Sequence, residues 1–192
     1  MMMYSALFHR NPRTPDAWSE AIGMMANAAP RLEGQLGTFH TGRVGIIVRP
    51  DSGQSTDSAR AQLDAILRTE PSTAALTLSI EDDHLGAQWV IARGTSLKGL
   101  VRDTGLAGEA LLGRDISARI VAAVFPFTWN DTRQYWIYQR RIKKYTPFVP
   151  VGAPAEERRD PALEARMEKA LRRELPTEKK MSEWYPIWGM PI

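Results

Sequence analysis

The fold is decided by residues 116–145, which read ISARIVAAVFPFTWNDTRQYWIYQRRIKKY. The runs 116–127 and 133–145 are both rich in β-branched and aromatic residues, which favour strands. Asn130 and Asp131 lie between the two runs, and these residue types tolerate the backbone conformations of tight turns. The pattern therefore predicts an antiparallel β-hairpin.

Another hairpin, the first in chain order, is predicted before it. Apolar residues alternate with Thr and Ser over residues 76–80, a polar turn follows at 81–86, and residues 88–93 again have the composition of a strand. Residues 38–49 contain alternating Val and Ile and predict one further strand. The chain therefore offers about five strands, two pairs of which are joined by short turns.

Four segments have the apolar spacing of amphipathic helices, and each is bounded by residues that commonly limit helices. The predicted helices run from Thr14 and Pro15 to Pro30, from Asp57 or a hydroxyl just before it to Pro71, from Ser96 to Gly113, and from Asp160 and Pro161 to Pro176. Glycine lowers helix propensity by about 1 kcal/mol relative to alanine, so we expect the third of these helices to be broken near Gly105.

The predicted order is helix, strand, helix, hairpin, helix, hairpin, helix. Hairpins separated by helices are typical of an α+β domain, in which helices pack on an antiparallel sheet. We expect residues 1–13 to form an apolar and basic arm, residues 14–176 the single α+β domain, and residues 177–192 an aromatic tail. Pro186, Gly189 and Pro191 prevent this tail from forming a helix, so we expect it to lie extended against the domain.

Composition excludes several classes of protein. The chain has 192 residues, 43% of them hydrophobic and 24% charged, and these are the proportions of an ordinary globular domain. It has no Cys, which rules out disulfides, thiolate metal sites and a cysteine nucleophile. The net charge of +3 is small for a nucleic-acid-binding protein. We therefore expect no cofactor, and no nucleic-acid partner on the basis of charge alone.

The first residues of the chain are apolar and are followed by basic ones. They have neither the length of a spanning helix nor the cationic start of a secretory signal, so we expect a cytoplasmic protein. An apolar stretch followed by cations can lie in a membrane interface, and an arm folded on the core or disorder is the alternative. The candidate membrane contacts are Met1, Met2, Met3, Leu7, Phe8, Arg10 and Arg13.

Catalytic motifs are weak in this sequence. Residues 81–84 read EDDH, which offers carboxylates and an imidazole for a divalent cation or for general-base catalysis in a hydrolase. Acidic residues are also common in turns for reasons of solvation, and a turn is predicted here. Residues 94–99 do not have the nucleophile-elbow spacing, and the chain has no phosphate-binding loop. We therefore expect no enzymatic activity.

Cations and aromatic residues are interleaved in the second hairpin. Arg140, Arg141, Lys143 and Lys144 follow three aromatic residues and precede Tyr145. Cations that contact phosphates and aromatic rings that stack on bases would suit single-stranded RNA, which is the alternative function for residues 133–145. Core packing of the aromatic residues, an anionic lipid surface or an acidic partner would explain the same pattern.

Several motifs resemble a known family. The C-terminal third contains YTPFVP at 145–150, ERRD at 157–160, ALE at 162–164, LP at 175–176 and SEWYPIWGMP at 182–191. These motifs resemble the C-terminal signature of the PspAB family, the PspA-associated proteins of actinobacteria and archaea. LFHR at 7–10, PD at 15–16, and Leu97, Leu100, Val101 and Asp103 in the third helix are similar to further family positions. The opening Met1-Met2-Met3-Tyr4 and the basic run 140–144 depart from the pattern.

The resemblance implies a non-enzymatic accessory protein of the phage-shock response to membrane stress. The implied partner is PspA, a coiled-coil protein that coats damaged membrane, so the place of action would be the cytoplasmic face of the membrane. The resemblance brings no catalytic residue and no cofactor. The candidate partner-binding residues are Arg140, Arg141, Lys143, Lys144, Tyr145, Trp184 and Trp188.

Overall fold

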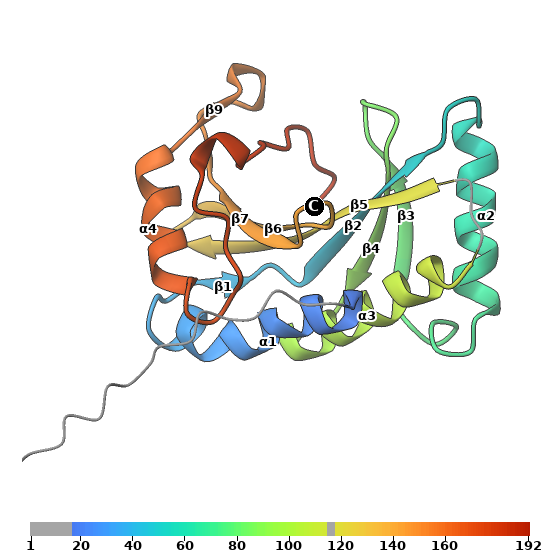
Figure 1. Cartoon of the computed structure of the whole chain (residues 1–192), viewed down its shortest axis with the longest axis horizontal. Helices are drawn as coiled ribbons and strands as arrows, with labels where there is room; N and C mark the ends of the chain where they lie inside the picture. The colour runs from blue at the N-terminus through green and yellow to red at the C-terminus, as the bar shows by residue number, and fades with distance from the viewer. Residues whose placement is uncertain (1–16, 115–117) are drawn as a thin grey trace, which may run out of the picture.

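The computed structural model of the chain describes residues 17–114 and 118–192 (Figure 1). The expected helix start at Thr14 and Pro15 and the first two residues of the run 116–127 lie outside the described residues. The described residues form four α-helices and a large antiparallel sheet, which confirms the predicted α+β class. The helices are α1 (Trp18–Gly34), α2 (Thr56–Thr69), α3 (Leu97–Leu112) and α4 (Pro161–Leu171).

The sheet has seven strands among the described residues, in the order β3-β4-β2-β5-β6-β7, with β1 paired to β5. The strands are β1 (Phe39–His40), β2 (Arg43–Pro50), β3 (Leu78–Asp82), β4 (Gln88–Arg93), β5 (Ala118–Trp129), β6 (Thr132–Gln139) and β7 (Lys144–Phe148). Two short strands, β8 (Pro150–Val151) and β9 (Arg158–Arg159), pair separately.

Both predicted hairpins are present, and the turn of the second has the expected chemistry. Asn130 and Asp131 have positive φ angles of 45° and 61°. Positive φ at both central residues produces a turn whose twist matches the flanking strands. The sheet has more strands than predicted because two predicted strands are each divided in two. Gly42, at φ 79°, separates β1 from β2, and Lys143, at φ 54°, lies in the turn between β6 and β7.

The starts of α2 and α4 agree with local sequence signals. The side chain of Ser55 accepts a hydrogen bond from the Ser58 N–H, and that of Asp160 accepts one from the Leu163 N–H. Such caps satisfy backbone donors that a helix leaves unpaired at its start. The end predicted for α4 at Pro176 is wrong, because this helix ends at Leu171.

Two further helix predictions were wrong because tertiary contacts outweigh local propensity. The first helix does not end at Pro30 but continues to Gly34, which buries Leu32 in the core. The third helix is not broken near Gly105 but is continuous through it. Gly105 lies against Ser19 of α1, and a Cβ atom at Gly108 would overlap the indole ring of Trp18. These glycines therefore let α1 and α3 pack closely together.

Gly108→Ala is expected to lower the free energy of unfolding by about 1–3 kcal/mol, because the added methyl group overlaps the Trp18 ring. Gly23→Ala on α1 is the matched control. No atom lies within 4 Å of the Cβ position of Gly23, so we expect a gain of about 0.5–1 kcal/mol from helix propensity. Urea denaturation measures both changes. A gain from both substitutions would contradict the close contact of α1 with α3.

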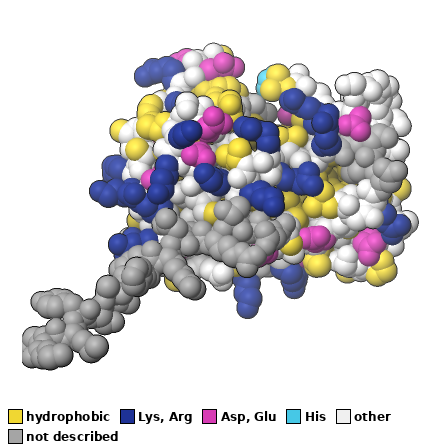
Figure 2. Space-filling model, in the orientation of Figure 1, with side chains coloured by type: hydrophobic (Ala, Val, Ile, Leu, Met, Phe, Trp, Pro, Cys, Tyr) yellow, Lys and Arg dark blue, Asp and Glu magenta, His cyan; other side chains and the backbone are white. Residues whose placement is uncertain are grey.

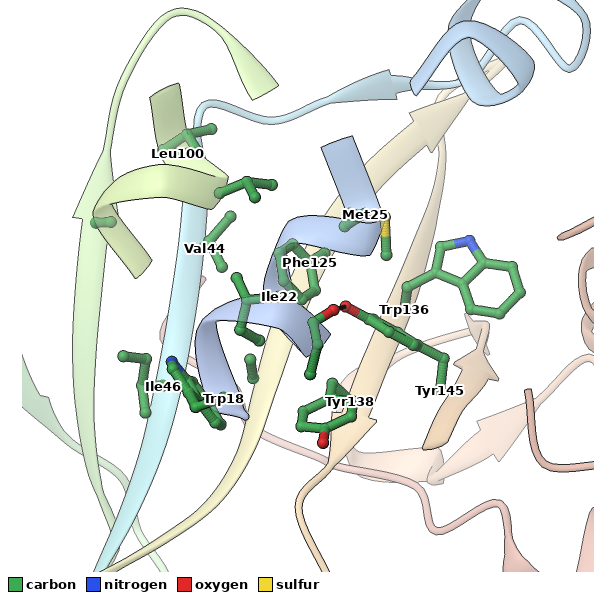
Figure 3. Close-up of a cluster of buried hydrophobic side chains, with 14 of the residues drawn as sticks. Trp18, Ile22, Met25, Val44, Ile46, Leu100, Phe125, Trp136, Tyr138 and Tyr145 are labelled. Atoms are coloured by element: carbon green, nitrogen blue, oxygen red, sulfur yellow. Dashed lines mark hydrogen bonds between the residues drawn. The ribbon is translucent and has the colours of Figure 1, made fainter. Parts of the chain in front are cut away.

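The main core lies between the sheet and the α1–α3 layer (Figures 1 and 3). Trp18, Ile22 and Met25 of α1 point toward aromatic and aliphatic side chains of the strands (Figure 3). The Tyr145 hydroxyl of β7 donates a hydrogen bond of 2.7 Å to the Ala21 carbonyl of α1. The Tyr145 side chain is fully buried, and this bond gives its hydroxyl a partner, so the ring packs in the core without an unpaired donor.

The opposite face of the sheet is covered by the C-terminal tail, residues 177–192 (Figure 1). Its Ile192 joins a second apolar cluster with Trp89 and other strand residues, and Ile187, Trp188 and Met190 pack against that cluster. A Cβ atom at Gly45 of β2 would lie 2.7 Å from the Trp89 ring and 3.1 Å from Ile192. The missing side chain at Gly45 therefore makes room for the end of the tail.

Candidate partner-binding site

The structure separates the candidate partner-binding residues into buried and exposed groups. Tyr145 is fully buried, and burial raises its pKa well above the usual value. Tyr135, Trp136 and Tyr138 of β6 are also at most 3% exposed. None of these four rings is available to stack on a nucleic-acid base. Tyr145 therefore contributes to the site only by holding the β6–β7 hairpin against α1.

Lys144 and Trp184 hold the start of the tail. Lys144 Nζ lies 2.7 Å from a carboxylate oxygen of Glu178, and this hydrogen bond lowers the pKa of Glu178 below its usual value. The Tyr145 backbone N–H donates to the Pro176 carbonyl, and the Glu178 N–H donates to the Tyr145 carbonyl. Trp184 is 4% exposed, and its indole N–H donates to the Glu178 carbonyl at 2.7 Å. Both side chains have structural roles here.

A buried ion pair anchors the next part of the tail. The guanidinium of Arg159 contacts both carboxylate oxygens of Glu164, which is fully buried. The same carboxylate accepts a hydrogen bond from the Val149 N–H, and Arg159 also donates to the Trp184 carbonyl at 2.6 Å. Burial raises the pKa of Glu164, although Arg159 and Val149 oppose this change. The pair thus joins α4, the segment after β7 and the tail.

Trp188 is half-buried in the tail. Its ring meets Phe148 of β7 edge-on, with a distance of 4.9 Å between the ring centroids. This arrangement is favourable for aromatic rings. Trp188 also lines a hollow between the tail and the sheet, whereas the buried Trp184 does not.

The remaining candidate cations, Arg140, Arg141 and Lys143, are exposed in the β6–β7 turn. They line an open groove of about 850 Å³ that also receives Arg49 from the end of β2 and Arg119 from the start of β5. Trp18 and Tyr138 form part of its floor. Lys and Arg side chains gather over the middle of the face seen in Figure 2, with hydrophobic side chains exposed between them. We call this hollow the cationic groove.

An apolar hollow of about 380 Å³ lies between the tail and the sheet. Arg49 and Arg141 line it as well as the cationic groove, and Asp83 is the one carboxylate among its described lining residues. We call it the apolar cleft. Its apolar lining comes from the sheet, the β3–β4 turn and the tail: Ile47, Leu85, Ala87, Val121, Ala122, Ile137, Tyr185, Pro186, Ile187 and Trp188.

A β-bulge at Val121 connects the groove and the cleft. Ile47 of β2 pairs with Ala122 of β5, whereas the next residue, Val48, pairs with Ile120. Val121 is therefore the extra residue on β5, and its side chain is 43% exposed. It lines both hollows, and its carbonyl accepts a hydrogen bond from the Arg140 N–H. The bulge places an exposed apolar side chain among the cations.

The acidic turn has structural contacts. Glu81 pairs with Arg93 and Asp82 with Arg60, while Asp83 accepts hydrogen bonds from the Leu85 and Ala87 N–H groups and from the Trp89 indole. Within residues 17–114 and 118–192, no group of three His, Cys, Asp or Glu side chains is placed to hold a metal ion. The three carboxylates of the candidate hydrolase cluster thus stabilise the β3–β4 hairpin and its contact with α2.

Sequence reasoning missed Arg49, Arg119 and Val121. A basic residue at the end of an apolar strand signals exposure, but it does not say which other strand ends lie nearby. Ala122 pairs with Ile47 on one side and Gln139 on the other, which brings the ends of β2 and β6 together around β5. The candidate membrane contacts Met1, Met2, Met3, Leu7, Phe8, Arg10 and Arg13 lie outside the described residues.

No helix in the described part of the chain has the length and hydropathy needed to cross a membrane.

Comparison with known proteins gives one family. No curated protein and no solved structure is significantly similar to the chain. The model of the family described as PspA associated protein B matches residues 1–192. Because this match spans the whole chain and agrees with the resemblance of its C-terminal motifs, the chain belongs to the PspAB family.

Proposed function

We propose that the protein is a non-enzymatic adaptor of the membrane-stress response, which binds PspA at the cytoplasmic face of the membrane. The observation that carries the proposal is the match of the PspA associated protein B family to the whole chain. An exposed surface that combines cations with apolar side chains supports a binding role. Burial of the four aromatic rings of residues 133–145 disfavours the alternative of single-stranded RNA.

Membrane contact by the protein alone is expected to be weak. A short apolar segment such as residues 1–8 binds an interface marginally, and each cation near an anionic surface adds about 1 kcal/mol. Arg10, Arg13 and the cations of the β6–β7 turn are candidates for this contribution. Marginal affinity suits a protein that engages the membrane only when its partner is present.

Sedimentation with anionic liposomes tests this function. The isolated protein is expected to bind marginally, to lose that binding when residues 1–8 are removed, and to be recruited much more strongly when PspA is added. Zwitterionic liposomes with PspA are the control, because they lack the negative surface charge of the anionic liposomes. Equal recruitment with and without PspA would contradict the adaptor role, and absence of recruitment together with no association in solution would contradict PspA as the partner.

A further inference from the structure

We propose that the apolar cleft and the cationic groove form one docking surface for an acidic amphipathic α-helix of the partner. This inference rests on the proposed function and adds where the partner binds and which chemistry it presents. An apolar side chain of the helix enters the cleft, and carboxylates beside it contact the cations of the groove.

The two hollows act as one surface because they share residues. Arg49, Val121 and Arg141 line both of them. The bulge at Val121 places that side chain at the boundary, 43% exposed. Tyr185 and Leu85, which line the cleft, are 54% and 64% exposed. Exposed apolar side chains grouped at a cleft and surrounded by polar groups are typical of interaction sites.

The backbone of the sheet excludes an added strand at this surface. The strands that form the cleft, β2, β5 and β6, are interior strands whose neighbours lie on both sides. At the β7 edge, the Tyr145 N–H and carbonyl are already bonded to residues 176 and 178 of the tail. A ligand segment on this face gains no backbone hydrogen bonds from the sheet, which favours an α-helix because its backbone groups are already paired with one another.

Charge complementarity identifies the helix as acidic. Arg49, Arg140 and Lys143 make no ion pair with any residue in the described part of the chain. The two carboxylates that line the hollows are occupied: Asp83 by the three donors of its hairpin, and Glu109 by the Ser19 N–H at 2.9 Å. Arg119 is paired with Asp51 and Arg141 with Glu183, so Arg49, Arg140 and Lys143 are the cations of this surface that remain to attract an acidic partner.

The size of the cleft indicates how the helix is anchored. A hollow of about 380 Å³ accommodates apolar side chains from the ligand but not a helix backbone. Binding energy in such interfaces is concentrated in a few anchor residues that fill pockets near the centre. The acids must lie on the groove side of the apolar stripe, at positions three or four residues apart, because those positions share a helix face.

The test compares two double variants with the same change in charge. Arg49→Glu with Arg140→Glu alters the docking surface, whereas Arg43→Glu with Arg133→Glu alters exposed residues at or near the starts of β2 and β6. Affinity for PspA is measured by titration calorimetry in the full-length chains. We expect the first pair to weaken binding at least about tenfold, and the second to change it less than about twofold.

Val121 tests the apolar part of the proposal. Val121→Asp is expected to weaken binding at least about tenfold, whereas Val121→Leu keeps the apolar contact and should bind like the unmodified protein. Thermal unfolding of each variant separates loss of fold from loss of binding. A charge swap identifies the bound helix. When acidic residues of that PspA helix are replaced by Lys, binding to the Arg49→Glu, Arg140→Glu double variant is expected to return.

The outcomes separate this inference from the proposed function. If the unmodified protein binds PspA and the two double variants bind equally well, the docking surface is wrong and the adaptor role stands. If the unmodified protein does not bind PspA, both are wrong. If the Arg49→Glu and Arg140→Glu pair reduces binding to phosphatidylglycerol vesicles but not to PspA, the occupant is lipid and the helix proposal is overturned.

Discussion

Trp184→Ala is expected to lower the free energy of unfolding by about 3–5 kcal/mol, the usual cost of removing a large buried aromatic side chain. The substitution leaves a cavity and removes the indole donor that bonds to the Glu178 carbonyl. For a domain of this size, the melting temperature should fall by roughly 10 °C. Differential scanning calorimetry measures this change.

Tyr185→Ala is the control for the same prediction. Tyr185 is the next residue of the tail but is 54% exposed, so its removal should change stability by less than about 0.5 kcal/mol. Deletion of residues 184–192 should destabilise more than Trp184→Ala, because it also uncovers the cluster around Trp89 and Gly45. An unchanged melting temperature after deletion would show that the tail is a free peptide in solution.

Tail stability bears directly on the proposed docking surface. Tyr185, Pro186, Ile187 and Trp188 supply one side of the apolar cleft, and Trp184 fixes the chain immediately before them. A tail that detached would leave the cleft without this side. Trp184→Ala should therefore also weaken PspA binding under conditions in which the α+β domain itself remains folded.

Arg159→Met is expected to destabilise the protein by about 3–5 kcal/mol at neutral pH, because it leaves the buried Glu164 carboxylate without its cation. Arg159 also bonds to the Trp184 carbonyl, so the effect reaches the tail. Urea unfolding over a range of pH measures the loss. The same substitution at the exposed neighbouring position, Arg158→Met, is the matched control.

The loss caused by Arg159→Met should depend on pH in a defined direction. Burial already raises the pKa of Glu164 in the folded protein, and removal of Arg159 takes away a contact that lowers it. The folded state then binds the proton more tightly than the unfolded state, so the deficit in stability becomes smaller as the pH falls through the raised folded pKa. A deficit that grows on acidification would contradict this account.

A double substitution separates the charge from the shape of the pair. Glu164→Gln in the Arg159→Met background removes the buried negative charge, so it should recover part of the lost stability at neutral pH. Recovery should be absent at acidic pH, where Glu164 is already protonated. Equal destabilisation by Arg159→Met with and without Glu164→Gln would mean that the charge of Glu164 does not matter.

Features that depend on neighbouring residues were predictable from the sequence. The Asn130–Asp131 turn, the cap at Asp160 and the α+β class follow from preferences that act over a few residues. The predictions failed where distant contacts outweigh such preferences. Burial of Leu32 continues α1 beyond Pro30, and contact with Trp18 makes glycine at position 108 favourable inside α3.

The candidate site was predicted only in part. Arg140, Arg141 and Lys143 are exposed, and they remain in the proposed site. Tyr145 and Trp184 are buried. The sequence did not decide whether they belong to a binding surface, because an aromatic residue looks the same in sequence whether its ring packs in a core or faces a ligand. Lys144 bonds to Glu178, which lies far away in the sequence. Solvent exposure depends on which segments cover a residue, and local patterns do not contain that information.

Local residue preferences thus determined the approximate positions of the helices, the two hairpins and the fold class, and the resemblance of the C-terminal motifs indicated the family. Tertiary structure alone decided which segments cover each face of the sheet, α1 and α3 on one and the tail on the other. It also decided that Arg49, Val121 and Arg140 lie together, through the pairing of β2, β5 and β6 and the bulge in β5. The physical reason is that turns, caps and propensities act between neighbours along the chain, whereas strand register and burial are set by the packing of segments that are distant in sequence.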